Sequence, residues 1–183
     1  VLLAGTLPGA EVSLTALAIF TNTCSVCFYF PLGLGVATNT RVSNELGAGR
    51  WASARFATRV SLQLGLVLVC CTSLAVLLGR SLWLRLFTSD RKVDHVAEPV
   101  LLVCGIYVAF DGLTAVLCGV LKGCGRQVLQ APIVILSYYL LGLPFACLMA
   151  WPCHLATFGL SLGSLLGTFV NFLGFALLLL KTE

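Results

Sequence analysis

Apolar residues form long uninterrupted runs along the chain, and short polar stretches separate these runs. The windows without a charged residue are 12–40, 60–79 and 127–180, and the window 99–121 contains a single charge. A helix needs about 20 apolar residues to cross the hydrocarbon core of a bilayer, so each window is long enough for one crossing. The window 127–180 is long enough for two crossings, and the helix breaker Pro152 lies near its middle.

The pattern predicts an all-α membrane protein, a bundle of about five complete transmembrane helices plus one truncated helix, in a single domain. The expected elements within residues 1–183 are a truncated helix at 1–7, spans at about 12–37, 60–79, 99–121, 128–150 and 158–180, and a cytoplasmic loop at 38–59. The chain starts at Val1, without a methionine or a charged segment ahead of the apolar run. We therefore expect a fragment, and no cleaved signal peptide.

The composition excludes an ordinary water-soluble domain. Hydrophobic residues make up 59% of the chain and charged residues 10%, and the mean hydropathy is +1.03. Soluble domains contain about 25% charged residues. Most of the nine cysteines lie in apolar windows, where cysteine behaves as a small hydrophobe, so no disulfide framework is predicted.

Basic residues are distributed unevenly between alternate connections. The connections 41–59 and 122–126 together with Lys181 carry seven Lys and Arg residues, whereas the other set, residues 80–98, carries four. Lys and Arg accumulate in cytoplasmic loops, so the first set is predicted to face the cytoplasm. Within it, Arg41 and Glu45 have the spacing of a helical ion pair. Residues 46–50 lack the Lys-Ser/Thr ending of a phosphate loop and predict a tight turn.

One acid lies inside a predicted span. Asp111 stands near the middle of the window 99–121, where an ionised carboxylate is costly and usually faces a cavity or a partner. Helical spacing places Tyr107 and Thr114 one turn before and after it, on the same face. We interpret Asp111 as a site of reversible proton binding. The alternative is an acid that stays protonated and only fixes helix packing.

Other polar residues occur at a similar depth in separate spans: Asn22, Tyr138, Tyr139 and Asn171. If these side chains converge with Asp111, they form a small hydrated cavity at the depth where secondary transporters bind substrate. The alternative for each is an interhelical hydrogen bond worth about 1 kcal/mol, and we favour it for Asn22 and Asn171 taken singly. Glycines recur at every fourth position over 159–167, which predicts close packing of the last span against another helix.

No enzymatic motif is present. The chain lacks His-Glu-x-x-His and Gly-x-Ser-x-Gly, and its only histidines, His95 and His154, fall in connections. Cys24 and Cys27 lack the second ligand pair that a zinc site needs. We therefore predict that the chain is not an enzyme and holds no metal or other cofactor.

Three stretches carry a family resemblance: PLGLGVATNTRVSNELGAG at 31–49, GVLKGCGRQ at 119–127 and YYLLGLP at 138–144. Together they resemble the multidrug and toxic compound extrusion (MATE) transporters, especially plant-type members. The resemblance implies two pseudosymmetric lobes of six helices around a central cleft. This chain would be the C-terminal lobe of such a twelve-helix transporter, from the end of its seventh helix onward.

In that register, Asp111 matches the acidic position of the tenth helix, which the family uses in cation coupling. The family's seventh-helix acid would lie upstream of Val1. Asn22 falls where some animal members carry glutamate and plant-type members often carry asparagine. The resemblance thus supports Asp111 as the proton-coupling residue, with H+ as the expected coupling ion.

We therefore predict the C-terminal half of a secondary active antiporter that exports organic compounds or xenobiotics in exchange for protons. One alternative is an inactive or partner-dependent membrane fragment. Another is a lipid or polysaccharide flippase, although such cavities usually carry basic groups and no mid-span position here is Lys or Arg. The expected partners are membrane lipid, a small organic substrate and the missing N-terminal lobe, without nucleic acid. The expected location is multi-pass, in the plasma membrane or the vacuolar membrane.

Overall fold

Every element of the described part of the chain is helical. The fold comes from a computed structural model that describes Gly5, residues 9–88 and residues 90–181. The elements are α1 (Ala10–Gly47), α2 (Trp51–Phe87), α3 (Arg91–Gly123), η2 (Gln127–Leu129), α4 (Gln130–Ile135), η3 (Leu136–Gly142), α5 (Leu143–Ala150) and α6 (Ala156–Leu180). Five helical segments are long and apolar enough to cross a membrane, with Gln127–Ala150 acting as one of them. The predicted fold class is confirmed, and the truncated helix expected at 1–7 falls largely outside the described residues.

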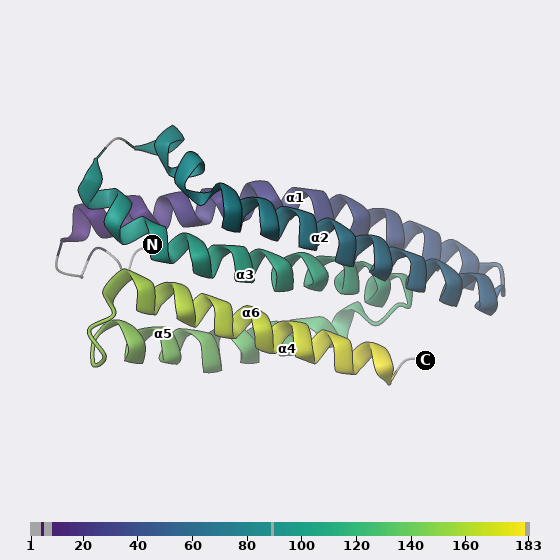
Figure 1. Cartoon of the computed structure of the whole chain (residues 1–183). Helices are drawn as coiled ribbons and strands as arrows, with labels where there is room; N and C mark the ends of the chain where they lie inside the picture. The colour runs from purple at the N-terminus through teal and green to yellow at the C-terminus, as the bar shows by residue number, and fades with distance from the viewer. Residues whose placement is uncertain (1–4, 6–8, 89, 182–183) are drawn as a thin grey trace.

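The long helices lie side by side as a bundle (Figure 1). Helix α3 lies between α1 and α2 on one side and α6 on the other, and it contacts all three. Its side chains Leu101, Val116 and Leu121 are fully buried. Helix α6 in turn packs against η3 and α5. The central position of α3 explains why this helix contributes more buried hydrophobic residues than any other helix of the described chain.

The prediction of a loop at 38–59 is wrong. Helix α1 continues to Gly47 and α2 begins at Trp51, so only residues 48–50 connect them. Arg41 and Arg50 both pair with Glu45, with N···O distances of 3.3 and 2.7 Å, which confirms the predicted Arg41–Glu45 pair. Gly49 has a φ of 71°, which suits the tight turn predicted here. The backbone hydrogen bonding of both helices thus continues through the polar residues beyond the apolar windows.

Glycines allow the helices to approach closely. A Cβ atom built on Gly163 would overlap Ala146, and one on Gly159 would lie 2.6 Å from the backbone of Met149. These contacts join α6 to α5, which confirms the packing role predicted for the glycines of the last span. Gly35 of α1 and Gly119 of α3 meet in the same way, backbone against backbone.

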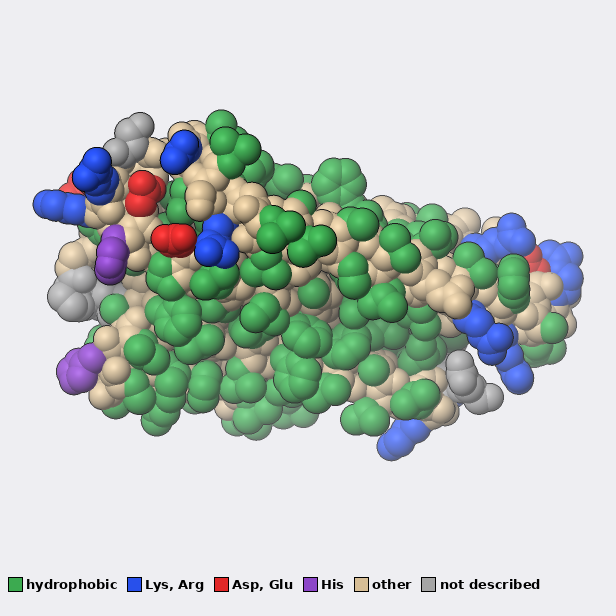
Figure 2. Space-filling view, viewed as in Figure 1, with side chains coloured by type: hydrophobic (Ala, Val, Ile, Leu, Met, Phe, Trp, Pro, Cys, Tyr) green, Lys and Arg blue, Asp and Glu red, His purple; other side chains and the backbone are tan. Residues whose placement is uncertain are grey.

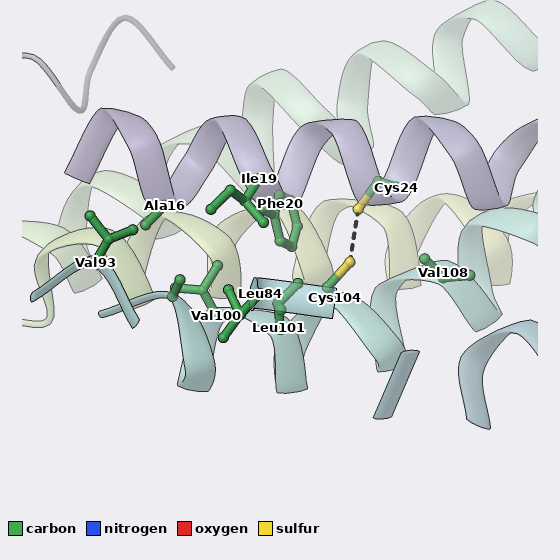
Figure 3. Packing of buried hydrophobic residues seen from close by; sticks show 11 residues of the cluster. Ala16, Ile19, Phe20, Cys24, Leu84, Val93, Val100, Leu101, Cys104 and Val108 are labelled. Atoms are coloured by element: carbon green, nitrogen blue, oxygen red, sulfur yellow. Dashed lines mark hydrogen bonds between the residues drawn. The ribbon is translucent and has the colours of Figure 1, made fainter. Parts of the chain in front are cut away.

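A cluster of apolar side chains fills the space between α1, α2 and α3 (Figure 3). Within it the sulfur atoms of Cys24 and Cys104 lie 3.3 Å apart, and both cysteines are free thiols. At its edge Trp83 donates a hydrogen bond of 2.8 Å from Nε1 to Oγ1 of Thr23. The cluster holds α1 and α3 together on the N-terminal side of Asp111 in α3.

Charged side chains gather at the two ends of the bundle, and apolar side chains cover the middle (Figure 2). Exposed leucines follow the outer face of α2: Leu64, Leu66, Leu74, Leu78 and Leu82. An apolar band between two polar ends is the surface that a bilayer requires. The chain is therefore an integral, multi-pass membrane protein.

Candidate functional site

Asp111 lies at the junction of two open cavities. One cavity, of about 660 Å³, is lined by side chains of α1, α3, α4 and α6, and it brings Asp111 together with Thr114 and Asn171. The other, of about 350 Å³, is lined by Asp111, Tyr107 and residues of α1 and α6. The Asp111 side chain therefore borders both cavities, although it lies deep in a span.

Hydroxyl groups from three segments meet beside this carboxyl group. The Tyr138 hydroxyl of η3 lies 2.9 Å from Oγ1 of Thr168 on α6. Tyr107 of α3 interacts with the same two side chains, and Asp111 interacts electrostatically with both tyrosines. The arrangement links α3, η3 and α6 through polar groups that interact electrostatically with Asp111.

Asn171 has unused hydrogen-bonding capacity. The residue is only 4% exposed, and its side chain interacts with Tyr138. Its Oδ1 atom accepts no hydrogen bond from any residue that the structure describes. A buried carbonyl oxygen without a partner is costly, so Oδ1 would gain a hydrogen bond in any rearrangement of the helices that exposed it to the cavity.

Thr114 contributes an acceptor. Its hydroxyl donates a hydrogen bond of 2.7 Å to the carbonyl oxygen of Phe110, one turn earlier in α3. Threonine commonly satisfies its hydroxyl in this way inside a helix. With the proton committed to the backbone, only the lone pairs of Oγ1 remain for cavity contents.

Two of the predicted cavity residues do not join this group. Asn22 is exposed on α1, and Tyr139 is 70% exposed, next to the inward-facing Tyr138. In the described part of the chain, neither lines a cavity that contains Asp111. Both lie at a suitable depth, but adjacent helical residues point in different directions, so depth alone does not place a side chain in the cavity.

The sequence analysis did not predict several residues of the site. Gln130 is buried and binds α3 twice: Cys118 Sγ donates to its Oε1 at 3.2 Å, and its Nε2 donates to the Cys118 carbonyl at 3.1 Å. Ser164 and Thr168 line or adjoin the same space. These two residues form, with Ser161 and Asn171, a polar stripe at spacings of three and four, which is a signal that helical periodicity could have revealed.

The site contains no evident metal-binding cluster. Among the residues that the structure describes, no three His, Cys, Asp or Glu side chains lie close enough to hold an ion together. The chemistry available at the site is proton binding by one carboxyl group and hydrogen bonding by hydroxyl and amide groups. Apolar side chains such as Phe28 and Phe175 complete the wall of the larger cavity.

The comparisons with known proteins identify the family. The sequence model of the MatE family matches residues 1–148. The chain is 36% identical over 169 residues to Protein DETOXIFICATION 18 of Arabidopsis thaliana and 34% identical over 183 residues to Protein DETOXIFICATION 16 of the same plant. These alignments cover 92% and 100% of this chain but 36% and 38% of the relatives. The chain thus spans little more than a third of the length of the curated relatives it matches.

Comparison with solved structures leads to the same family. The crystal structure of the eukaryotic MATE transporter AtDTX14 superimposes with a TM-score of 0.95 at 32% identity, over 100% of this chain and 41% of that chain. An inward-facing MATE family transporter of multidrug resistance shares the fold, with a TM-score of 0.80 at 22% identity over 92% of this chain and 38% of that one. The resemblance carried by the three sequence stretches is confirmed. The chain belongs to the MatE family.

Proposed function

We propose that this chain is the C-terminal lobe of a secondary active antiporter that exports organic compounds, xenobiotics among them, in exchange for protons. The observation that carries the proposal is the position of Asp111, which borders both open cavities. Among the seven acids of the sequence, it alone falls in the middle of a predicted span. An ionisable group held at this depth is expensive, and function is the usual reason for keeping it.

Protonation would change what Asp111 can do with its neighbours. An ionised carboxyl group only accepts hydrogen bonds, whereas the protonated group also donates one. Tyr107 and Tyr138 interact both with Asp111 and with Thr168. A change in the charge of Asp111 therefore alters the polar interactions between α3, η3 and α6. Each protonation state then favours a different arrangement of these helices, which is the requirement for coupling.

The larger cavity suits an organic substrate. Its volume of about 660 Å³ lies within the range of about 300–1,000 Å³ typical of small-molecule sites. Its wall combines aromatic rings with the carboxyl group of Asp111 and the amide of Asn171. An amphipathic or cationic molecule would find both apolar contact and a charge partner here.

A second lobe would complete the transporter. The relatives are more than twice as long as this chain, and transporters built from repeats bind substrate between their halves. Rocking of the two lobes would expose the cavity to each side of a plasma or vacuolar membrane in turn. We therefore expect the isolated chain to be inactive.

The test is proton-driven efflux from proteoliposomes. The chain is fused to the upstream part of AtDTX14, which superimposes on it with a TM-score of 0.95. Export of a fluorescent organic cation is measured after imposing a pH gradient. Asp111→Asn should abolish gradient-driven export, and Asp111→Glu should retain part of it. Glu11→Gln removes an exposed acid at the start of α1 and should leave export unchanged.

Gradient-driven export at the same rate in the fused protein and in its Asp111→Asn variant would refute the coupling role. Translocation of a fluorescent phospholipid in place of the cation would favour the flippase alternative. Export by the isolated chain would show that the second lobe is dispensable.

A further inference from the structure

A basic groove lies at the end of the bundle opposite the loop that joins α2 to α3. It comprises a cavity of about 380 Å³ between the end of α1, the start of α2, the end of α3 and the end of α6. A neighbouring cavity of about 430 Å³ extends it along α2 and shares Arg55 and Thr58 with it. We call the two cavities together the basic groove. None of the residues that line the Asp111 cavities belongs to it.

The groove contains three arginines, Arg55, Arg59 and Arg126. The acid nearest to Arg55 in sequence, Glu45, already pairs with Arg41 and Arg50. In the described residues, none of the three groove arginines has a carboxylate within ion-pair distance. Burial raises the pKa of the Cys124 thiol in the groove wall, so this group stays neutral. Among the described residues, the groove therefore carries positive charge without a carboxylate to balance it.

The floor of the groove is apolar. Val42, Val120 and Leu179 close its inner wall and are at most 8% exposed, and the accessible apolar surface is that of Trp51 in the first cavity and of Leu62 and Leu66 in the second. A free inorganic anion would gain nothing from such a floor, whereas an acyl chain would. The combination of guanidinium groups and accessible aliphatic side chains matches a molecule with a charged head and an apolar tail.

The depth of the groove agrees with this chemistry. Trp51, at its rim, is 65% exposed, and tryptophan is enriched at the level of lipid headgroups. This end of the bundle carries the larger cluster of basic side chains (Figure 2), and we predict that it faces the cytoplasm. Anionic phospholipids concentrate in the cytoplasmic leaflet. In addition, the first turn of α2 has no acid and no side-chain cap, so its helix dipole also favours an anion.

We propose that the basic groove binds one anionic phospholipid of the cytoplasmic leaflet, its phosphate near Arg55 and Arg126 and an acyl chain along Leu62 and Leu66. Arg59 lies beside this chain in the second cavity. The bound lipid ties the start of α2 to the end of α3. This site is separate from the cavity at Asp111 and does not depend on transport.

Native mass spectrometry of the full chain in micelles tests the proposal. The probes are phosphatidylserine and phosphatidylcholine with identical acyl chains, and inorganic phosphate as a free anion. We expect one phosphatidylserine to bind about tenfold or more tightly than phosphatidylcholine, since two basic groups contact the headgroup. An excess of inorganic phosphate should not displace it.

The variant Arg55→Gln/Arg126→Gln should lose this preference. The matched control, Arg85→Gln/Lys181→Gln, also removes two positive charges, but from exposed positions outside the groove, and should keep the preference. Equal binding of the two lipids by the unmodified chain would overturn the proposal, as would displacement by phosphate. An equal loss of the preference for phosphatidylserine in the variant and in the control would also overturn the proposal. If the variant fails to fold, the lipid comparison on the unmodified chain still decides.

Discussion

Replacement of Gly35 by alanine should loosen the packing of α1 on α3. A Cβ atom at this position would lie 2.6 Å from the carbonyl oxygen of Ala115, whereas ordinary contact begins at 3.4 Å. The helices must therefore separate by about 3.4 − 2.6 = 0.8 Å. The obstacle is backbone, so no side-chain rotation relieves it. Gly33, two residues earlier in the same helix, has nothing within 4 Å of its Cβ position and provides the matched control.

The magnitude follows from two opposing terms. Overpacking costs about 1–3 kcal/mol, while alanine in a helix interior regains about 0.5–1 kcal/mol relative to glycine. Gly35→Ala should thus lower the free energy of unfolding by about 0–2.5 kcal/mol relative to the unmodified chain, and by about 1–3 kcal/mol relative to Gly33→Ala. Gly33→Ala should leave it unchanged or raise it slightly. The measurement is reversible unfolding in mixed micelles by titration with sodium dodecyl sulfate, followed by circular dichroism. Equal stability of the two variants would refute the close helix contact.

Two further substitutions probe polar contacts. Tyr138→Phe removes the hydroxyl that contacts Thr168 at 2.9 Å and should slow gradient-driven export by the fused protein. Tyr139→Phe alters a residue that is 70% exposed and should have no effect. Slower export by Tyr139→Phe than by Tyr138→Phe would contradict the proposed site. Trp83→Phe removes the hydrogen bond to Thr23 and should cost about 0.5–1.5 kcal/mol in the same unfolding titration. Trp51→Phe, at an exposed position, should cost less, and a loss as large as that of Trp83→Phe would argue against the hydrogen bond.

Hydropathy predicts the membrane fold because the bilayer leaves the chain few alternatives. Every backbone polar group must be satisfied within the segment, so a long apolar run becomes a helix. The ends of the helices are harder to predict. Arg41 and Glu45 mark where the apolar window closes, yet α1 continues to Gly47, because the two side chains pair on the helix surface and need not end it.

The depth of a polar residue can be read from the sequence, but its direction cannot. Asp111, Thr114 and Asn171 line one cavity, whereas Asn22 and Tyr139, at a similar depth, do not. Tyr138 and Tyr139 are adjacent in the π-helix η3 (Leu136–Gly142), so they point in different directions: Tyr138 contacts Thr168, and Tyr139 is 70% exposed. Pattern analysis based on 3.6 residues per turn does not anticipate such a segment. Directions therefore require the packed structure.

The most direct test of the central claim is to observe the proton on Asp111. Infrared difference spectroscopy of the fused protein, recorded between acidic and alkaline buffer, reports the carbonyl stretch of a protonated carboxyl group. We predict a band that appears and disappears reversibly with pH, that is lost in Asp111→Asn and that persists in Glu11→Gln. A band that stays constant across the pH range, or that survives the Asp111→Asn substitution, would contradict reversible proton binding at this site.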